Sequence, residues 1–376
     1  MKFRCERDTL LEALLVTSRA VTSRGVPTAM SGLLLELEGS SLKVTGSDPE
    51  HDLVIEASVD VFGTRAGRCV PPAQLFCDIV RSLEPGAVVV EAADEEFRVT
   101  GGHSQFTLNA FDPSEYLVLP GVDSGEVRLD ARELVVALRQ VARAAASDRD
   151  KAEKLAGVLF AGEEDKLSLV ATDSYRLALR EVAGVEGEVG GLTALVPAVS
   201  LNQLQRLLAS LGADVAQVAL RTAPSFAVFE IGQYTVRTRL IEQQFPDYRD
   251  LIPATSPNRL TVPRESFIDA VRRTSLVVRG SVDPLRLVLS TEGVRLLAER
   301  RELGRAEEDV YGKYEGEELT IGLNPAFLVD GLDGATTEEV VIEVVNDAKP
   351  VVVRGLGVDD YVYLLMPVRI AAGTPV

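Results

Sequence analysis

The chain has 376 residues, which is enough for two or three domains of average size. Apolar residues make up 46% of it and charged residues 26%, and these values exclude a disordered chain, a collagen-like repeat and a coiled-coil rod. With 39 Lys and Arg against 57 Asp and Glu, the net charge is −18, so the body as a whole should repel nucleic acid.

The first residues and the cysteines indicate a cytoplasmic protein. The opening MKFRCERDTL lacks the apolar core of a secretory signal. No apolar stretch reaches the roughly 20 residues that a membrane-spanning helix needs. Cys5, Cys69 and Cys77 are odd in number and have no metal-ligand spacing, so no disulfide framework is expected.

The first third of the chain mixes amphipathic helices with short strands. Its pattern predicts a helix at 10–15, strands at 33–37 and 42–48, a helix over 74–83 and a strand at 88–90. The middle third repeats this mixture, with a helix at 134–138, a strand at 167–173, a helix over 201–211 and a strand at 234–240. The last third does so again, with a helix at 267–271, a strand at 294–299, a helix at 326–332 and a strand at 340–345.

Landmarks that return at a nearly constant spacing divide the chain into three domains. The strand at 42–48 returns at 167–173, which is 125 residues later. The Val-Pro pair at 70–71 precedes a helix and returns at 196–197, and a third copy, Leu-Asn-Pro, stands at 323–325. A repeat of this length is a whole domain, because solenoid units run about 20–50 residues. The predicted domains are 1–122, 123–253 and 254–376.

Several helix ends carry recognisable signals. Ser200 with Gln203 has the spacing of a capping box. Asn324 followed by Pro325 is typical of a helix start, and Gly212 stands where the helix over 201–211 should stop. Two helices beside antiparallel strands in each repeat predict an α+β fold.

Basic residues concentrate on the predicted helices. The six helices with their flanking turns sum to +4, which leaves −22 for the strands and loops. The last helix, 325–334, is an exception with two aspartates and a charge of −2. If the helices share one surface, that surface would bind phosphates weakly, without sequence preference and in a salt-sensitive way. Any single arginine can equally belong to a solvated helix face.

The chain lacks the motifs of common catalytic and cofactor sites. His51 and His103 are its two histidines, and neither has a partner at metal-ligand spacing. The glycine-rich phosphate loops and the nucleophile elbow are missing from the sequence. Tryptophan is absent and aromatic residues total 5%, which gives no support for base readout or for stacking on single strands. We expect no catalytic residue, no cofactor and no metal.

Five motifs occur in the order and at the spacing of a known family. They are Met-Lys-Phe at 1–3, Ala-Thr-Asp-Ser-Tyr-Arg-Leu-Ala at 171–178, Phe-Pro-Asp-Tyr-Arg at 245–249, Ile-Gly-Leu-Asn at 321–324 and Tyr-Val-Tyr-Leu-Leu-Met-Pro-Val-Arg at 361–369. Through these motifs and its threefold repeat, the full length of the chain resembles the bacterial DNA polymerase III β subunit, the replicative sliding clamp.

The resemblance implies a processivity factor and not an enzyme. Members of this family form a head-to-tail homodimer whose domains close into a ring around duplex DNA, with helices lining the hole and antiparallel sheets on the rim. The ring tethers the replicative polymerase and other replication and repair proteins by topology, without sequence-specific contacts. The 3′–5′ exonuclease activity of the holoenzyme is then not intrinsic to this subunit. No membrane contact is expected.

The resemblance also assigns a pocket between the second and third domains. Partners such as the polymerase III catalytic subunit and the clamp loader dock a short peptide there. Ser174-Tyr175 stands where relatives commonly have Gly-His, which bears on the peptide preferred. The pocket residues carried over by motif are Leu155, Thr172, Ser174, Tyr175, Arg176, Leu177, Pro246, Leu251, Val282, Asn324, Phe327, Leu364, Met366, Pro367, Val368 and Arg369.

DNA contacts and a subunit interface follow in the same way. The basic residues in two loops that match DNA-facing loops of the family are Arg24, Arg149, Lys151 and Lys154. The candidates from helix placement alone are Arg139, Arg143, Arg206, Arg272 and Arg273. The interface would pair an edge strand carrying Phe106 and Leu108 with Leu276 and Val277 of the other subunit, which covers an exposed edge.

Two rival functions stay open. One is a hydrolase or transferase with an acidic metal site, for which Asp48, Asp173 and Glu307 are the carboxylates to test. The other is a scaffold whose acidic surface binds basic proteins and never touches DNA.

Overall fold

The computed structural model describes residues 1–21, 28–93, 96–116, 119–122, 125–146, 153–253, 255–280 and 283–370. The chain forms two compact units. Unit 1 comprises Met1–Arg132, Gly184–Glu188 and Val199–Ile241, and unit 2 comprises Glu133–Ala183, Val189–Ala198 and Glu242–Val376. Each unit contains two of the four sheets found among the described residues.

Unit 1 is built on a five-stranded and an eight-stranded sheet. The five-stranded sheet has the order β5 (Phe62–Arg65), β1 (Lys2–Glu6), β7 (Ala87–Ala93), β8 (Glu96–Gly101), β9 (Ser104–Asn109). The eight-stranded sheet has the order β10 (Glu126–Asp130), β15 (Gln217–Ala223), β16 (Phe226–Ile231), β17 (Tyr234–Arg239), β4 (Leu53–Asp60), β3 (Ser41–Asp48), β2 (Leu34–Glu38), β6 (Gly67–Cys69).

Unit 2 is built on a nine-stranded and a four-stranded sheet. The nine-stranded sheet has the order β14 (Thr193–Pro197), β11 (Gly157–Glu163), β12 (Lys166–Thr172), β13 (Arg176–Val182), β26 (Val358–Leu365), β25 (Val351–Gly355), β24 (Glu339–Val344), β18 (Asn258–Pro263), β22 (Lys313–Glu315). The four-stranded sheet has the order β21 (Gly304–Val310), β20 (Gly293–Arg300), β19 (Leu285–Ser290), β23 (Leu319–Leu323).

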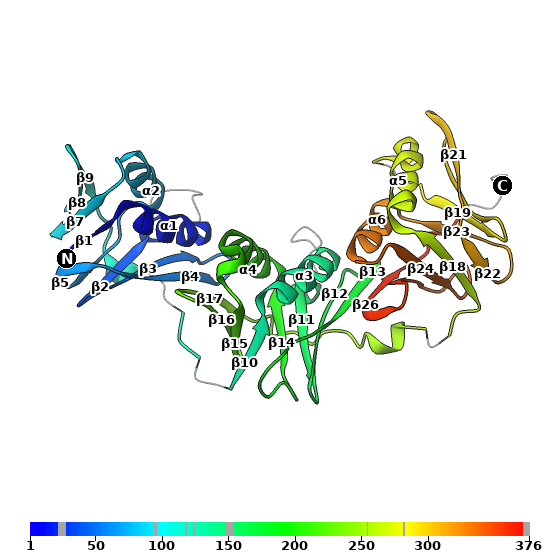
Figure 1. Ribbon diagram of the computed structural model, residues 1–376, viewed down its shortest axis with the longest axis horizontal. Helices are drawn as coiled ribbons and strands as arrows, with labels where there is room; N and C mark the ends of the chain where they lie inside the picture. Colours follow the sequence, from blue (N-terminus) through cyan, green and yellow to red (C-terminus); the bar gives the residue numbers. More distant parts are fainter. Residues whose placement is uncertain are drawn as a thin grey trace. The chain divides into compact units, whose positions relative to one another are not determined.

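Pairs of helices cover these sheets (Figure 1). In unit 1, α1 (Arg7–Thr17) packs on α2 (Ala73–Ser82) and on strands β3 and β4. In unit 2, α5 (Arg264–Thr274) packs on α6 (Pro325–Gly334) and on strands β20 and β21. Helices α3 (Ala131–Val141) and α4 (Ala198–Leu211) belong to the middle third of the chain. Neighbouring strands in all four sheets run antiparallel, so the predicted α+β class is confirmed.

The two long sheets join strands from different repeats. In unit 1, β17 pairs with β4, with Val236 opposite Ile55. In unit 2, β13 pairs with β26, with Leu177 opposite Leu364. Both junctions are central in their sheets, where apolar residues on each strand are buried. The second repeat is therefore divided between the two compact units. The domain boundaries at 122 and 253 stay a prediction.

The helix ends show which local signals the fold uses. Asn324 caps α6 as predicted, and α4 ends at Leu211 before Gly212, whose φ is 58°. The capping box at Ser200 is wrong, because α4 begins at Ala198 and Ser200 is buried inside the helix. Its hydroxyl lies 2.7 Å from the Thr238 hydroxyl of β17, so a tertiary hydrogen bond satisfies it instead.

Within the described part of the chain, the helices are all too short or too polar to cross a membrane.

Candidate functional site

The turn between β12 and β13 places several predicted pocket residues at one end of these strands. Thr172 Oγ1 accepts a hydrogen bond from the Ser174 N–H at 3.1 Å and donates to the Arg176 carbonyl at 2.6 Å. The Asp173 carboxylate accepts from the N–H groups of Tyr175 at 2.9 Å and Arg176 at 3.0 Å. Ser174 has a φ of 78°, in the left-handed region that glycine adopts without strain. The turn is thus held by its own polar groups.

Arg176 links this turn to helix α6. Its Nε lies 3.0 Å from Asp173, and a terminal nitrogen pairs with Asp330 of α6. The guanidinium carbon also lies 4.2 Å from the centre of the Phe327 ring, within cation–π range. Burial would lower the pKa of Arg176, but Tyr363 and Asp330 outweigh burial and raise that pKa above its ordinary value. Arg176 therefore stays a cation with its side chain only 11% exposed.

The end of β26 places Met366 beside the same turn. Leu177 of β13 and Leu364 of β26 are paired and buried beneath the site. The Met366 N–H donates to the Tyr175 carbonyl at 2.9 Å. Met366 is 41% exposed and Tyr175 67% exposed, so two large apolar side chains stand at the surface on adjoining segments. Such residues can anchor an apolar side chain of a peptide, and methionine adapts its shape to the ligand.

The start of α6 completes the group. Asn324 Oδ1 accepts from the N–H of Ala326 at 2.9 Å and of Phe327 at 3.3 Å. Past β26, the Val368 N–H donates to the Gly322 carbonyl at 2.8 Å, which fixes this segment against the strand that leads into α6. A hollow of about 450 Å³ opens here, lined by Asn324 and Val368 and, on its other side, by residues at the end of α5.

The remaining predicted pocket residues take no part in these contacts. Leu155 ends the short turn Glu153–Leu155 and is buried. Pro246 is half-buried and Leu251 is 47% exposed, and both lie between β17 and β18. Pro367 is half-buried and Arg369 is exposed after β26. Val282 lies outside the described residues.

The predicted DNA contacts fall into three groups. Those that are exposed on the surface are Arg139, Lys154 and Arg206. Those that are bound to carboxylates of the chain itself are Arg143, Arg272 and Arg273, the last by a 3.2 Å hydrogen bond from its Nε to Glu308. Those that lie outside the described residues are Arg24, Arg149 and Lys151.

Two aspartates on α6 bind predicted DNA contacts, and sequence reasoning missed their role. Arg143 Nη1 lies 3.5 Å from Asp330 and 3.9 Å from Asp333. Arg272 Nη2 lies 3.4 Å from Asp333. The two aspartates are three residues apart, so they share one face of the helix. The signal that could have found them was the negative charge of this helix among neutral or basic ones.

Both halves of the predicted subunit interface lie at strand edges. Phe106 and Leu108 are on β9, the outermost strand of the five-stranded sheet, and both are half-buried. Leu276, which is 57% exposed, and Val277 lie in the turn Ser275–Val278. That turn packs on β20 and on β21, the outermost strand of the four-stranded sheet.

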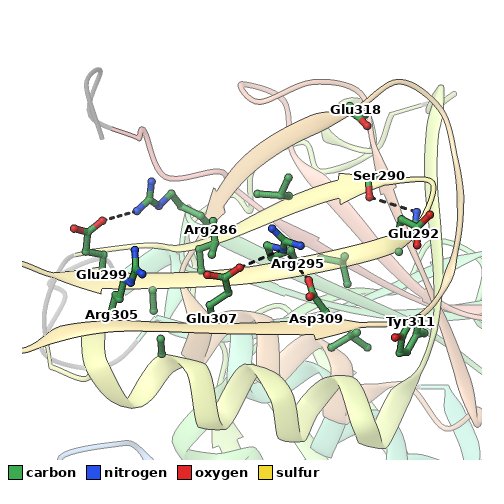
Figure 2. Close-up of a pocket in the computed structure, with 17 residues that line it drawn as sticks. Arg286, Ser290, Glu292, Arg295, Glu299, Arg305, Glu307, Asp309, Tyr311 and Glu318 are labelled. Atoms are coloured by element: carbon green, nitrogen blue, oxygen red, sulfur yellow. Dashed lines mark hydrogen bonds and ion pairs between the residues drawn. The ribbon is translucent and has the colours of Figure 1, made fainter. Parts of the chain in front are cut away.

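A second hollow, of about 680 Å³, lies over the four-stranded sheet (Figure 2). Arg295 is 2.8 Å from Asp309 and 3.4 Å from Glu307, and Arg286 is 3.0 Å from Glu299. These ion pairs run as a ladder across β19, β20 and β21. The pairs of Arg295 are exposed, as is typical of a sheet face near an edge, whereas Arg286 is buried. Glu307, a carboxylate of the rival metal-site hypothesis, is engaged in this ladder.

The other rival carboxylates also have local partners. Asp48 Oδ2 lies 2.7 Å from His51 Nδ1, and its Oδ1 accepts from the backbone N–H of Glu50 and His51. These three residues are the one group within the described ranges whose side chains could together meet a metal ion. The hydrogen bonds of Asp48 close a tight turn, which is a structural role. Asp173 is held by Arg176.

Comparison with known families covers nearly the whole chain. The family model for the N-terminal domain of the DNA polymerase III beta subunit matches residues 1–120. The model for its central domain matches residues 128–247, and the model for its C-terminal domain matches residues 249–369.

Named relatives and solved structures agree with these matches. The beta sliding clamps of Staphylococcus epidermidis and Staphylococcus aureus are both 28% identical over 380 residues, which cover 98% of this chain and 99% of each relative. The DNA polymerase III subunit beta of Pseudomonas aeruginosa has a TM-score of 0.92 at 26% identity, over 98% of this chain and 100% of that one. The DNA polymerase sliding clamp of Bacillus subtilis has a TM-score of 0.92 at 25% identity, over 99% and 100%. The resemblance seen in the sequence is confirmed, and the chain belongs to the bacterial DNA polymerase III beta subunits, the sliding clamps.

Proposed function

We propose that this chain is a sliding clamp, a non-enzymatic subunit that encircles duplex DNA and holds the replicative polymerase on its template. The observation that carries the proposal is the ordered match of all three clamp domains along the chain. A closed ring on a circle cannot dissociate, so it needs only weak contacts that permit sliding. The helices with their flanking turns, which sum to +4 on a chain of −18, offer such weak and sequence-independent contacts.

For the ring we propose a head-to-tail homodimer. The outer strand β9 of one subunit would meet the outer strand β21 of the other, with Phe106 and Leu108 packing on Leu276 and Val277. The support is that both patches lie at edges that have no further strand among the described residues. Exposed edges invite pairing with another chain, and closure of the ring would remove them.

For partner binding we propose the pocket around Arg176, Phe327 and Met366, together with the other residues carried over by the resemblance. Its support is the exposure of Met366 and Tyr175 beside a buried, bonded arginine. The partners would be the polymerase III catalytic subunit, the clamp loader and other proteins with short clamp-binding peptides. Domains of 1–122, 123–253 and 254–376 and a cytoplasmic location belong to the same proposal.

For DNA we propose contacts by basic residues of the helices and of two loops. The support is that those of these residues that lie in the described ranges are either exposed or paired with carboxylates at the surface. The proposed DNA contacts are Arg24, Arg139, Arg143, Arg149, Lys151, Lys154, Arg206, Arg272 and Arg273.

Retention on circular DNA tests the proposal. The protein is loaded on a nicked plasmid with a bacterial clamp loader, separated from free protein, and the plasmid is then cut once. We expect stable retention on the circle and rapid loss after cutting. Met366→Ala should load less efficiently and stimulate the polymerase less, because the loader and the polymerase dock at this pocket, but rings already loaded should leave the cut plasmid as fast as the wild type. Equal retention on both forms of DNA would contradict topological binding, and a lack of loader-dependent retention would favour the scaffold. Magnesium-dependent turnover abolished by Asp48→Asn would favour the enzyme.

A further inference from the structure

The negative charge of α6 is not accounted for by the proposed function. Helix α6 carries Asp330 and Asp333 and no basic residue. Its neighbour α5 carries Arg264, Arg272 and Arg273 together with Glu265 and Asp269, and Arg272 Nη1 also lies 4.0 Å from Asp269. On a surface that meets DNA phosphates, two carboxylates should repel the duplex unless they serve another purpose.

Both carboxylates are bound by arginines that the proposed function assigns to DNA. Arg143 approaches Asp330 and Asp333 at 3.5 and 3.9 Å, and Arg272 approaches Asp333 at 3.4 Å. Arg143 is 28% exposed and Arg272 55% exposed, so phosphates could reach both. Arg176 also pairs with Asp330, so that aspartate serves the candidate peptide site as well.

Helix α6 itself is firmly held, which fixes the position of its carboxylates. Buried Gln140 of α3 donates to the carbonyl of Gly334. The Tyr361 hydroxyl donates to the carbonyl of Gly331 at 3.3 Å, and burial raises the pKa of Tyr361, so the donor stays protonated. The arginines are long and have many rotamers, so any exchange of partners occurs through the arginines and not through the helix.

We propose that Asp330 and Asp333 compete with DNA phosphates for Arg143 and Arg272 and thereby weaken the grip of the clamp on the duplex. An aspartate beside an arginine offsets part of the arginine's charge and occupies some of its N–H donors, so the net gain from each phosphate contact is small. The ring therefore slides with less resistance than its arginine count implies. This inference rests on the proposed function, because it requires duplex DNA beside these helices.

Asp333→Asn is the clean test, because the ion pairs of Arg176 are with Asp173 and Asp330 and the change removes a charge with little change of shape. The variant ring, loaded on a nicked plasmid, should leave the cut plasmid about two- to fivefold more slowly than the wild type at about 0.05 M salt. The difference should vanish at about 0.5 M salt, where phosphate contacts are screened. A purely structural defect would not be cancelled by salt.

Three matched variants sharpen the test. Asp333→Glu keeps the charge and should slide like the wild type. Glu181→Gln removes an equal charge from an exposed pair with Lys166, 3.1 Å away on neighbouring strands, and should leave run-off unchanged. In a background of Arg143→Ala with Arg272→Ala, the added change of Asp333→Asn should slow run-off less than it does in the wild type, because only the direct repulsion of phosphates by Asp333 is left to remove.

The outcomes distinguish a failure of this inference from a failure of the proposed clamp function. A wild-type ring that stays on the nicked circle, together with a run-off time that Asp333→Asn leaves unchanged at every salt concentration, overturns the inference alone. Equal slowing by Glu181→Gln also overturns it, because net charge would then be the cause. A wild-type protein that fails to stay on the circle overturns both.

Discussion

Arg176 and Arg295 are each held by two carboxylates, yet they belong to different kinds of surface. Arg176 is 11% exposed, also contacts the Phe327 ring, and donates to the backbone carbonyl of Arg143. Arg295 is 53% exposed, and its partners Glu307 and Asp309 are equally open to water. Water competes for the charges of an exposed ion pair, so the pair adds little to the free energy of unfolding. When a buried pair loses one partner, the other charge stays buried without compensation. Burial and the number of bonded groups therefore distinguish Arg176 from the exposed Arg295.

The largest expected effect of this difference is on stability. Arg176→Ala should lower the free energy of unfolding by about 3 kcal/mol, because Asp173 loses its buried partner. Arg295→Ala, its match on the four-stranded sheet, should leave stability within experimental error. Urea denaturation followed by circular dichroism measures both, since urea adds no ionic screening. Equal losses in the two variants would show that burial does not separate the two regions.

The next effect concerns binding at the two surfaces. Phe327→Ala should weaken binding of a fluorescent clamp-binding peptide about thirtyfold, which corresponds to about 2 kcal/mol for an aromatic anchor. Tyr311→Ala removes a ring that is 82% exposed beside the polar hollow and should not change peptide affinity. Fluorescence anisotropy gives both dissociation constants. A comparable loss with Tyr311→Ala would place the peptide on the other surface.

A smaller effect should come from the strained turn next to Arg176. Ser174→Gly should stabilise the fold by about 0.5 kcal/mol, because relief of the left-handed backbone outweighs the added entropy of the unfolded chain. Gly102, already glycine at a φ of 56°, gives the opposite control: Gly102→Ser should destabilise the fold. Thermal and urea unfolding of both variants measure these changes. A destabilised Ser174→Gly protein would mean that the Ser174 side chain does more than fill the turn.

The smallest effect is expected on the exposed ladder. Glu307→Gln should leave stability unchanged within error, because Arg295 keeps Asp309 at 2.8 Å and solvent replaces the lost partner. Urea unfolding at low and high salt checks this. A clear loss that disappears at high salt would show that the ladder is more tightly coupled than its exposure suggests.

Much of the fold could be predicted from local sequence signals. Asn324 before Pro325 marks the start of α6 correctly, because an asparagine cap and proline at the first position act within one turn. Gly212 marks the end of α4 for a similar reason. Ser200 misled the prediction because its hydroxyl bonds to Thr238, 38 residues away, and no local rule can foresee that partner.

The candidate site was predictable only through family motifs. Arg176, Phe327 and Met366 come from three segments far apart in the chain, and nothing in their spacing indicates that they meet. The role of Asp330 and Asp333 was missed because charge along a sequence does not reveal which arginines face it. Their pairing with Arg143 and Arg272 becomes visible only when α3, α5 and α6 are placed together.

The strand pairs β4–β17 and β13–β26 cross the repeats, and this has a practical consequence for dissecting the protein. Cutting the chain at 122 would separate β4 from β17, and cutting it at 253 would separate β13 from β26. Each cut would expose an apolar edge strand in the middle of a long sheet. Fragments made for crystallography or inhibitor screening should therefore be soluble only when they end outside such a shared sheet, and single repeats expressed alone should aggregate.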